Sequence, residues 1–154
     1  MMRTYLVVID ETPEAEVALR FAARRAAKTG GTIEVLALVP KTEFVAWGSV
    51  QATMELEARE HAEELVAAAL TMVTAETQTV ITPSIRVRSG KPVAEVQATI
   101  AENPNIAALV LGAAASGPPG PLVSHFAGAD TGKLACPLMI VPGALSPEAI
   151  DRLS

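Results

Sequence analysis

The chain contains few of the residue types that build metal centres or covalent catalytic sites. Of its 154 residues, one is cysteine and two are histidine. A single cysteine excludes an intrachain disulfide and a thiolate metal cluster. Cys136 precedes a proline and an apolar run, which favours a small buried hydrophobic residue over a nucleophile. No three metal-ligating side chains occur at ligand spacing, so we expect no metal site.

Positive charge is also scarce. The net charge is −5, and no run of lysine and arginine is longer than a pair. This composition argues against a nucleic-acid-binding groove, which needs clustered cations facing phosphates. It argues equally against binding to an anionic membrane surface. We therefore expect neither nucleic acid nor membrane as a partner.

Long hydrophobic runs are missing as well. The longest stretch without a formal charge, residues 103–129, is interrupted by Pro118, Pro119, Gly120 and Pro121. No apolar run reaches the roughly 18 residues that a membrane-spanning helix needs. The first apolar run is short and leads directly to Asp10, which is not the pattern of a signal peptide. We expect a cytoplasmic protein.

Apolar segments alternate with helical patterns along the whole chain. Continuous apolar runs are typical of strands buried on both faces, whereas the alternating pattern of residues 83–89 predicts a half-covered strand near a sheet edge. The order predicts one α/β domain over residues 1–154, a doubly wound five-stranded parallel sheet with helices on both faces. Strands are predicted at 5–9, 32–39, 83–89, 106–111 and 138–141, and helices at 12–28, 50–77 (apolar stripe ending at Met72), 93–102, 121–134 and 146–153.

Ligands of such sheets bind outside the carboxyl ends of the strands, near the point where the strand order reverses. The residues at these ends are Asp10 after the first strand, Val39 after the second and Gly112 after the fourth. Asp10 has two interpretations, an acid or base at a site and a turn residue that bonds local amides.

A glycine-rich stretch, VLGAAASGPPGPLVSHFAGADTGK, begins at Val110. It fits no phosphate-binding loop, because Pro118 replaces the lysine after one glycine pair and the pair before Lys133 is one residue too close. Neither Ser116 nor Ser124 lies in a G-x-S-x-G elbow. We predict no catalytic residue and a protein that is not an enzyme.

Four segments resemble the universal stress protein family: YLVVIDETPEAEVALRFAARRAAKTGGTIEVLALV, SGKPVAEVQATIAE, ALVLGAAASG and CPLMIVP. The resemblance extends to Gly143. It implies a Rossmann-like sheet with strand order 3-2-1-4-5. It also implies frequent homodimerisation through the last strand, here Leu138 to Val141, and binding of ATP or AMP by some members.

The family's ATP-binding pattern, G-x2-G-x9-G-[ST], is poorly kept. Gly112 matches its first glycine, but Ala115, Ser124 and His125 occupy the other three positions, and the spacing is one residue short. A methyl group at 115 hinders close approach of a phosphate, and the neighbouring prolines lack amide donors. We therefore predict a degenerate nucleotide-binding loop. The candidate nucleotide-binding residues are Asp10, Val39, Gly112, Ala115, Gly117, Ser124, His125 and Phe126.

Three functional hypotheses follow. The first is a non-catalytic, homodimeric stress-response module that binds a ligand or partner at the strand ends, with no certain cofactor. The alternative is a genuine ATP- or AMP-binding protein with an altered phosphate loop, and the third hypothesis adds weak ATPase activity to it. Phe44 and Trp47, in the connection at 40–49, either cover a small ligand different from ATP or pack at a dimer contact.

Overall fold

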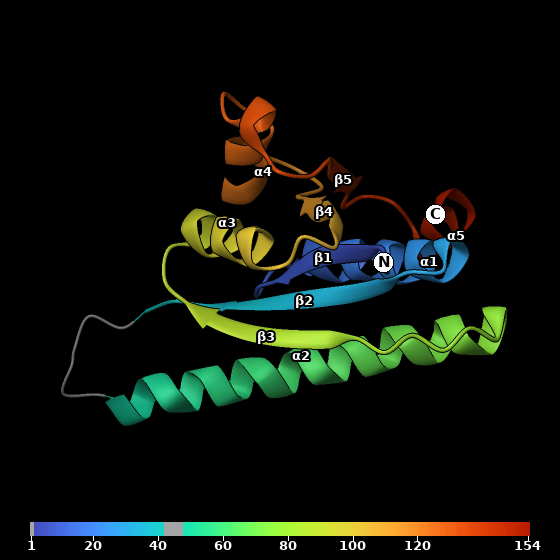
Figure 1. Ribbon diagram of the computed structural model, residues 1–154, viewed down its shortest axis with the longest axis horizontal. Helices are drawn as coiled ribbons and strands as arrows, with labels where there is room; N and C mark the ends of the chain where they lie inside the picture. Colours follow the sequence, from blue (N-terminus) through green and yellow to red (C-terminus); the bar gives the residue numbers. More distant parts are fainter. Residues whose placement is uncertain (1, 42–47) are drawn as a thin grey trace.

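The five predicted strands form one parallel sheet in the order β3-β2-β1-β4-β5 (Figure 1). The computed structural model describes residues 2–41 and 48–154. The predicted α/β class and strand order are confirmed. The strands are β1 (Thr4–Ile9), β2 (Thr32–Val39), β3 (Ser84–Ser89), β4 (Ile106–Ala113) and β5 (Leu138–Pro142), and the helices are α1 (Pro13–Thr29), α2 (Gly48–Thr77), α3 (Pro92–Glu102), α4 (Pro121–Phe126) and α5 (Pro147–Leu153).

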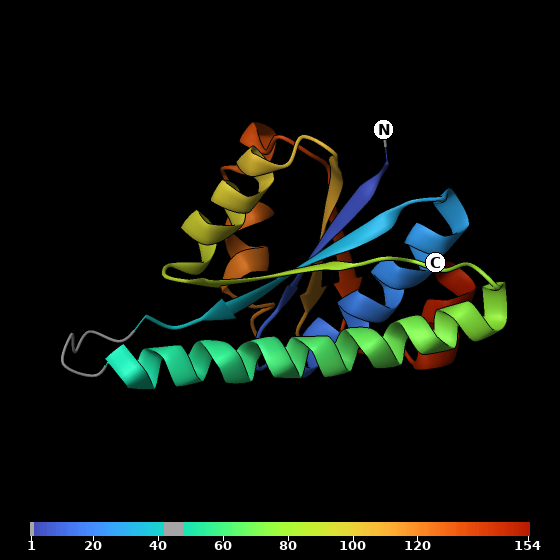
Figure 2. The same ribbon diagram turned by 60° about the horizontal axis from the view of Figure 1, so that its bottom comes forward.

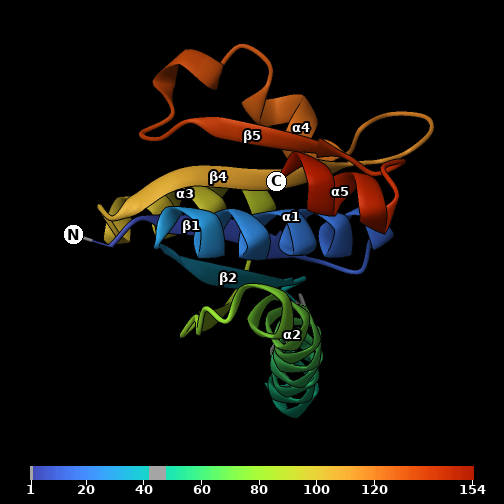
Figure 3. The same cartoon turned by 90° about the vertical axis from the view of Figure 1, so that its right-hand side faces the viewer.

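Helices cover both faces of the sheet, because successive strand residues point to opposite sides and both sides are apolar. Val7 faces a core shared with α1 and α2, whereas Leu6 and Val8 face a core shared with α3 and α4. Figure 3 shows α1 and α5 in front of the sheet and α3 behind it. The long helix α2 runs beside the sheet (Figure 2). None of the described helices is long and apolar enough to cross a membrane.

The strand predicted at the sheet edge, β3, lies at that edge and has no buried residue. Arg88 forms ion pairs with Glu95 at 2.7 Å and Glu102 at 2.9 Å on α3. The Nη1 of Arg59, on α2, donates a hydrogen bond to the main-chain oxygen of Ile85 at 3.4 Å. Charged side chains thus occupy the outer surface of β3, which discourages pairing with another strand.

The helix predicted at 121–134 was wrong in its second half. α4 ends at Phe126, and only a 3-10 turn, Thr131–Lys133, follows before β5. The Thr131 hydroxyl donates to the main-chain oxygen of Gly128 at 2.7 Å and closes the turn. Two glycines between 127 and 133 lower helix propensity, and this local hydrogen bond competes with continuation of the helix.

Charged side chains hold α5 against α1. The Nε and Nη2 of Arg20 donate to the two carboxylate oxygens of Asp151, at 2.8 and 2.7 Å. Arg24, buried in α1, pairs with the same carboxylate and with Glu76 of α2 at 2.6 Å. The hydrogen bond from Arg20 holds the pKa of Asp151 below its ordinary value, against a smaller opposing effect of burial. Ile150 of α5 is buried beside this cluster.

We expect Asp151→Asn to lower the free energy of unfolding by about 2 kcal/mol, because it removes charge-assisted hydrogen bonds. Folding lowers the pKa of Asp151, so its contribution is fully present above the ordinary value of 3.8 and is lost as the pH falls through the folded value. Urea unfolding of the unchanged protein and of the variant, at neutral pH and well below pH 3.8, measures the contribution of Asp151 to the free energy of unfolding. Glu148→Gln, an exposed change on the same helix, is the control. An equal effect of the two substitutions would contradict the prediction.

Candidate functional site

A crevice opens where the strand order reverses, between the carboxyl ends of β1 and β4. Its volume is about 140 Å³. Val8, Leu111 and Leu122 contribute apolar surface, and Asp10 and Glu14 contribute carboxylates. The remaining lining comes from the start of α1 and the turn before it, the end of β4, and the loop and first turn of α4, namely Thr12, Ala15, Gly112, Ala114, Pro118, Pro119, Gly120, Pro121 and Val123.

Asp10 takes part in the turn that joins β1 to α1. Its Oδ1 accepts a hydrogen bond from the main-chain N–H of Thr12 at 2.9 Å and another from the Thr12 hydroxyl. The side chain therefore organises the local backbone, and it also lines the crevice. Both interpretations of Asp10 that the sequence left open are compatible with this geometry.

Gly112 brings β4 close to α1. A Cβ atom at this position would lie 2.1 Å from the main-chain oxygen of Glu14, a separation that real Cβ atoms do not show. The glycine is thus required by packing of the first helical turn against the strand, independently of any phosphate. The same close approach places Glu14 in the crevice lining.

The loop between β4 and α4 is a closed turn. The main-chain N–H of Ala114 donates to the oxygen of Pro119 at 3.1 Å. Gly117 and Gly120 have φ angles of 73° and 115°, and nothing lies within 4 Å of a Cβ at either position, so backbone conformation explains both glycines. Pro118, Pro119 and Pro121 contribute no N–H donors to this part of the crevice.

The structure brings together two of the eight candidate residues, Asp10 and Gly112, at the crevice. The others do not line it. Val39 is buried at the end of β2, whereas Ala115, Gly117 and Ser124 are exposed. His125 Nε2 lies 3.1 Å from Asp130, and the ring packs edge-on against Phe126 with centroids 5.1 Å apart. Phe126 is fully buried in the core between α3, α4 and the sheet.

The charge of the crevice is negative. Asp10 and Glu14 line it, and the described residues of its lining include no lysine, arginine or histidine. Glu14 was not among the predicted site residues. Its position in the first turn of a helix that follows a strand end could have indicated that it lies at the crevice. Phe44 and Trp47 lie outside the described residues. Among the residues that the structure describes, no group of three or more His, Cys, Asp and Glu side chains could hold a metal ion.

The family model of the universal stress proteins matches residues 1–142. The chain belongs to the universal stress protein family. The match ends with β5, so α5 lies beyond it. A comparison with curated proteins finds no match.

Solved structures of the family share the fold at low identity. A universal stress protein from Lactobacillus plantarum is 19% identical, with 90% of this chain and 97% of that chain covered and a TM-score of 0.70. The Archaeoglobus fulgidus protein in complex with dAMP is 19% identical, with 91% and 97% covered and a TM-score of 0.55. A universal stress protein in complex with cAMP is 14% identical, with 90% and 96% covered and a TM-score of 0.53.

We expect Gly112→Ala to destabilise the protein by about 2 kcal/mol or more, since an added methyl group forces α1 away from β4. Gly132→Ala is the matched control, because nothing lies within 4 Å of a Cβ there and its φ angle is not positive. The midpoints of urea unfolding curves measure the difference in stability between the two variants, provided that the dependence of the unfolding free energy on urea concentration is unchanged. A Gly112→Ala protein as stable as the control would refute the packing role of this glycine.

Proposed function

We propose that this chain is a non-catalytic, ligand-binding member of the universal stress family, with a loop that has lost tight affinity for ATP. The observation that carries the proposal is the crevice between β1 and β4, where Asp10 and Glu14 are the only charged residues among the described residues that line it. Carboxylates accept hydrogen bonds, so the crevice favours a ligand that presents hydroxyl or amino donors.

A ribose fits the crevice in size and chemistry. A cavity of about 150 Å³ accommodates a six-membered ring, close to the 140 Å³ of the crevice. The sugar hydroxyls would donate to the carboxylates, and the base and any phosphate would lie outside. Relatives in complex with cAMP and with dAMP support an adenine-containing ligand.

A triphosphate is disfavoured by the same carboxylates. Two like unit charges about 6 Å apart near a protein surface repel by about 3 kcal/mol, and the lining residues that the structure describes offer no cation in compensation. The prolines at 118, 119 and 121 also remove amide donors that could hold phosphate oxygens. The ligand that we propose is therefore adenosine or a similar nucleoside.

A second candidate function is binding of an adenine nucleotide with one phosphate. The cAMP and dAMP complexes of relatives favour it, because both ligands carry a single phosphate. Mass spectrometry of small molecules released on denaturing the purified protein distinguishes the candidates. Recovered AMP supports this second candidate, and recovered ATP contradicts the proposed loss of affinity.

Calorimetry with adenosine, AMP and ATP tests the charge argument. We expect adenosine to bind most tightly and ATP most weakly. Glu14→Gln removes one carboxylate and should raise ATP affinity about tenfold, which is about 1.4 kcal/mol, without raising adenosine affinity. Glu11→Gln, an exposed change outside the crevice lining, is the control. Tight ATP binding by the unchanged protein, or no binding of any of the three, would refute the proposal.

We further propose that two copies pair through β5. This strand forms the sheet edge opposite β3, and Ile140 at its centre is 41% exposed. An unpaired apolar edge strand favours pairing with another strand.

We expect the unchanged protein to sediment as a dimer and Ile140→Lys to sediment as a monomer at high micromolar concentration, because burying a lysine at the paired edge is costly. Val80→Lys is the control, since Val80 is 80% exposed and lies in the connection before β3. A monomeric unchanged protein, or a dimeric Ile140→Lys protein, would exclude β5 as the dimer contact.

A further inference from the structure

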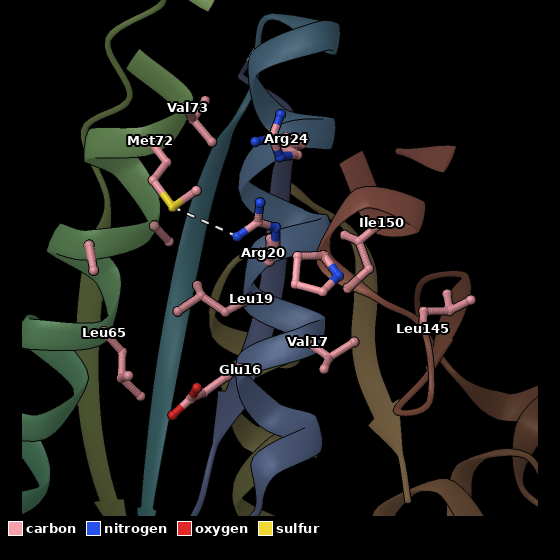
Figure 4. A pocket seen from close by; sticks show the side chains of 13 residues that line it. Glu16, Val17, Leu19, Arg20, Arg24, Leu65, Met72, Val73, Leu145 and Ile150 are labelled. Atoms are coloured by element: carbon pink, nitrogen blue, oxygen red, sulfur yellow. Dashed lines mark hydrogen bonds between the residues drawn. The ribbon is translucent and has the colours of Figure 1, made fainter. Parts of the chain in front are cut away.

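A second and larger pocket lies between α1, α2 and α5, away from the crevice. Its volume is about 270 Å³. Figure 4 shows the side chains that line it, which come from the three helices and from the turn before α5. Most of them are apolar, and Met72 remains 43% exposed although the sequence pattern predicted it on the core face of α2. The main apolar contributors are Val17, Leu19, Leu65, Met72, Leu145 and Ile150.

Two arginines form the polar end of this pocket. The Nη1 of Arg20 donates to the sulfur of Met72 at 3.7 Å (Figure 4), and a thioether is a weak acceptor. Arg24 is 5% exposed, and its Nη2, which has no hydrogen-bond acceptor among the described residues, is buried out of reach of the pocket. The Nη1 of Arg20 is therefore the donor that a ligand in the pocket can reach. A ligand oxygen would give this donor a stronger acceptor than the thioether.

The charges around the pocket favour an uncharged ligand. Arg20 and Arg24 are already paired with Asp151 and Glu76. Glu16 lines the other end of the pocket (Figure 4), so three carboxylates face two guanidinium groups. An anionic ligand would find no net positive charge. A cationic ligand such as an alkylammonium would be repelled by the arginines, and it has no acceptor for their N–H groups.

We propose that this pocket binds an uncharged amphipathic molecule: a hydrocarbon body with one oxygen acceptor, such as a medium-chain alcohol or ketone. A dry apolar cavity of about 150 Å³ holds benzene, so 270 Å³ accommodates about ten non-hydrogen atoms. The body lies among the leucine, isoleucine and methionine side chains, and the oxygen accepts from the Nη1 of Arg20. Leu145, Pro147 and Ile150, which form one wall, lie beyond the part that the family model matches.

The test is a titration of the full chain, labelled with ¹⁵N, with 1-octanol, octanoate and octylamine, followed by amide chemical shifts. We expect saturable shifts with octanol in α1, α2 and α5, and at least fivefold weaker binding of both charged analogues. Ala68 is exposed and lines the pocket, whereas its neighbour Ala67 is exposed and does not. Ala68→Trp should weaken octanol binding at least tenfold, and Ala67→Trp should change it less than twofold.

Three results would overturn the proposal: no saturable shift in these helices up to the solubility limit of octanol, equal octanol affinity of the two tryptophan variants, or tighter binding of octanoate than of octanol. Met72→Phe is a second pocket-filling variant should Ala68→Trp fail to fold, and it carries the same expectation of at least tenfold weakening. Adenosine affinity measured on the same variants should be unchanged, which separates this pocket from the crevice.

Discussion

The close packing of α1 against β4 determines most of what this protein can bind. At Gly112 the strand touches the main chain of Glu14, and no larger residue fits. This contact fixes the first turn of α1 at the reversal of strand order, where Glu14 and Asp10 give the crevice its negative charge. Two turns further along, the same helix presents Arg20 and Arg24 to α2 and α5. One helix therefore sets the chemistry of both pockets.

The fold could be predicted because the strands are marked by continuous apolar runs, and β3 by its alternation with Arg86 and Arg88. The end of α4 at Phe126 could not be predicted, because it depends on the local turn at Thr131, which competes with a longer helix. At the candidate site, sheet topology predicts that Asp10 and Gly112 lie near each other, and both line the crevice. Spacing along a family pattern placed His125 there, but that side chain lies beside Asp130 and does not line the crevice.

Pockets between helices are harder to foresee than sites at strand ends. A strand end is fixed by sheet topology, which follows from the order of elements. The pocket beside Met72 depends instead on the relative placement of three helices, and one of them is held by the pairing of Arg20 with Asp151, 131 positions apart. Helical periodicity assigned Met72 to the core because it reports the direction of a side chain and not whether a neighbour fills the space.

The two edges of the sheet differ, and this difference limits the size of any assembly built through strands. β3 carries arginine ion pairs, and Arg59 occupies one of its main-chain oxygens, whereas the other edge exposes Ile140. If two copies pair through β5, as we propose, a twofold axis relates them and the two β3 strands become the outer edges of the joined sheet. Growth into a fibre would then need pairing at β3, which its charged side chains disfavour.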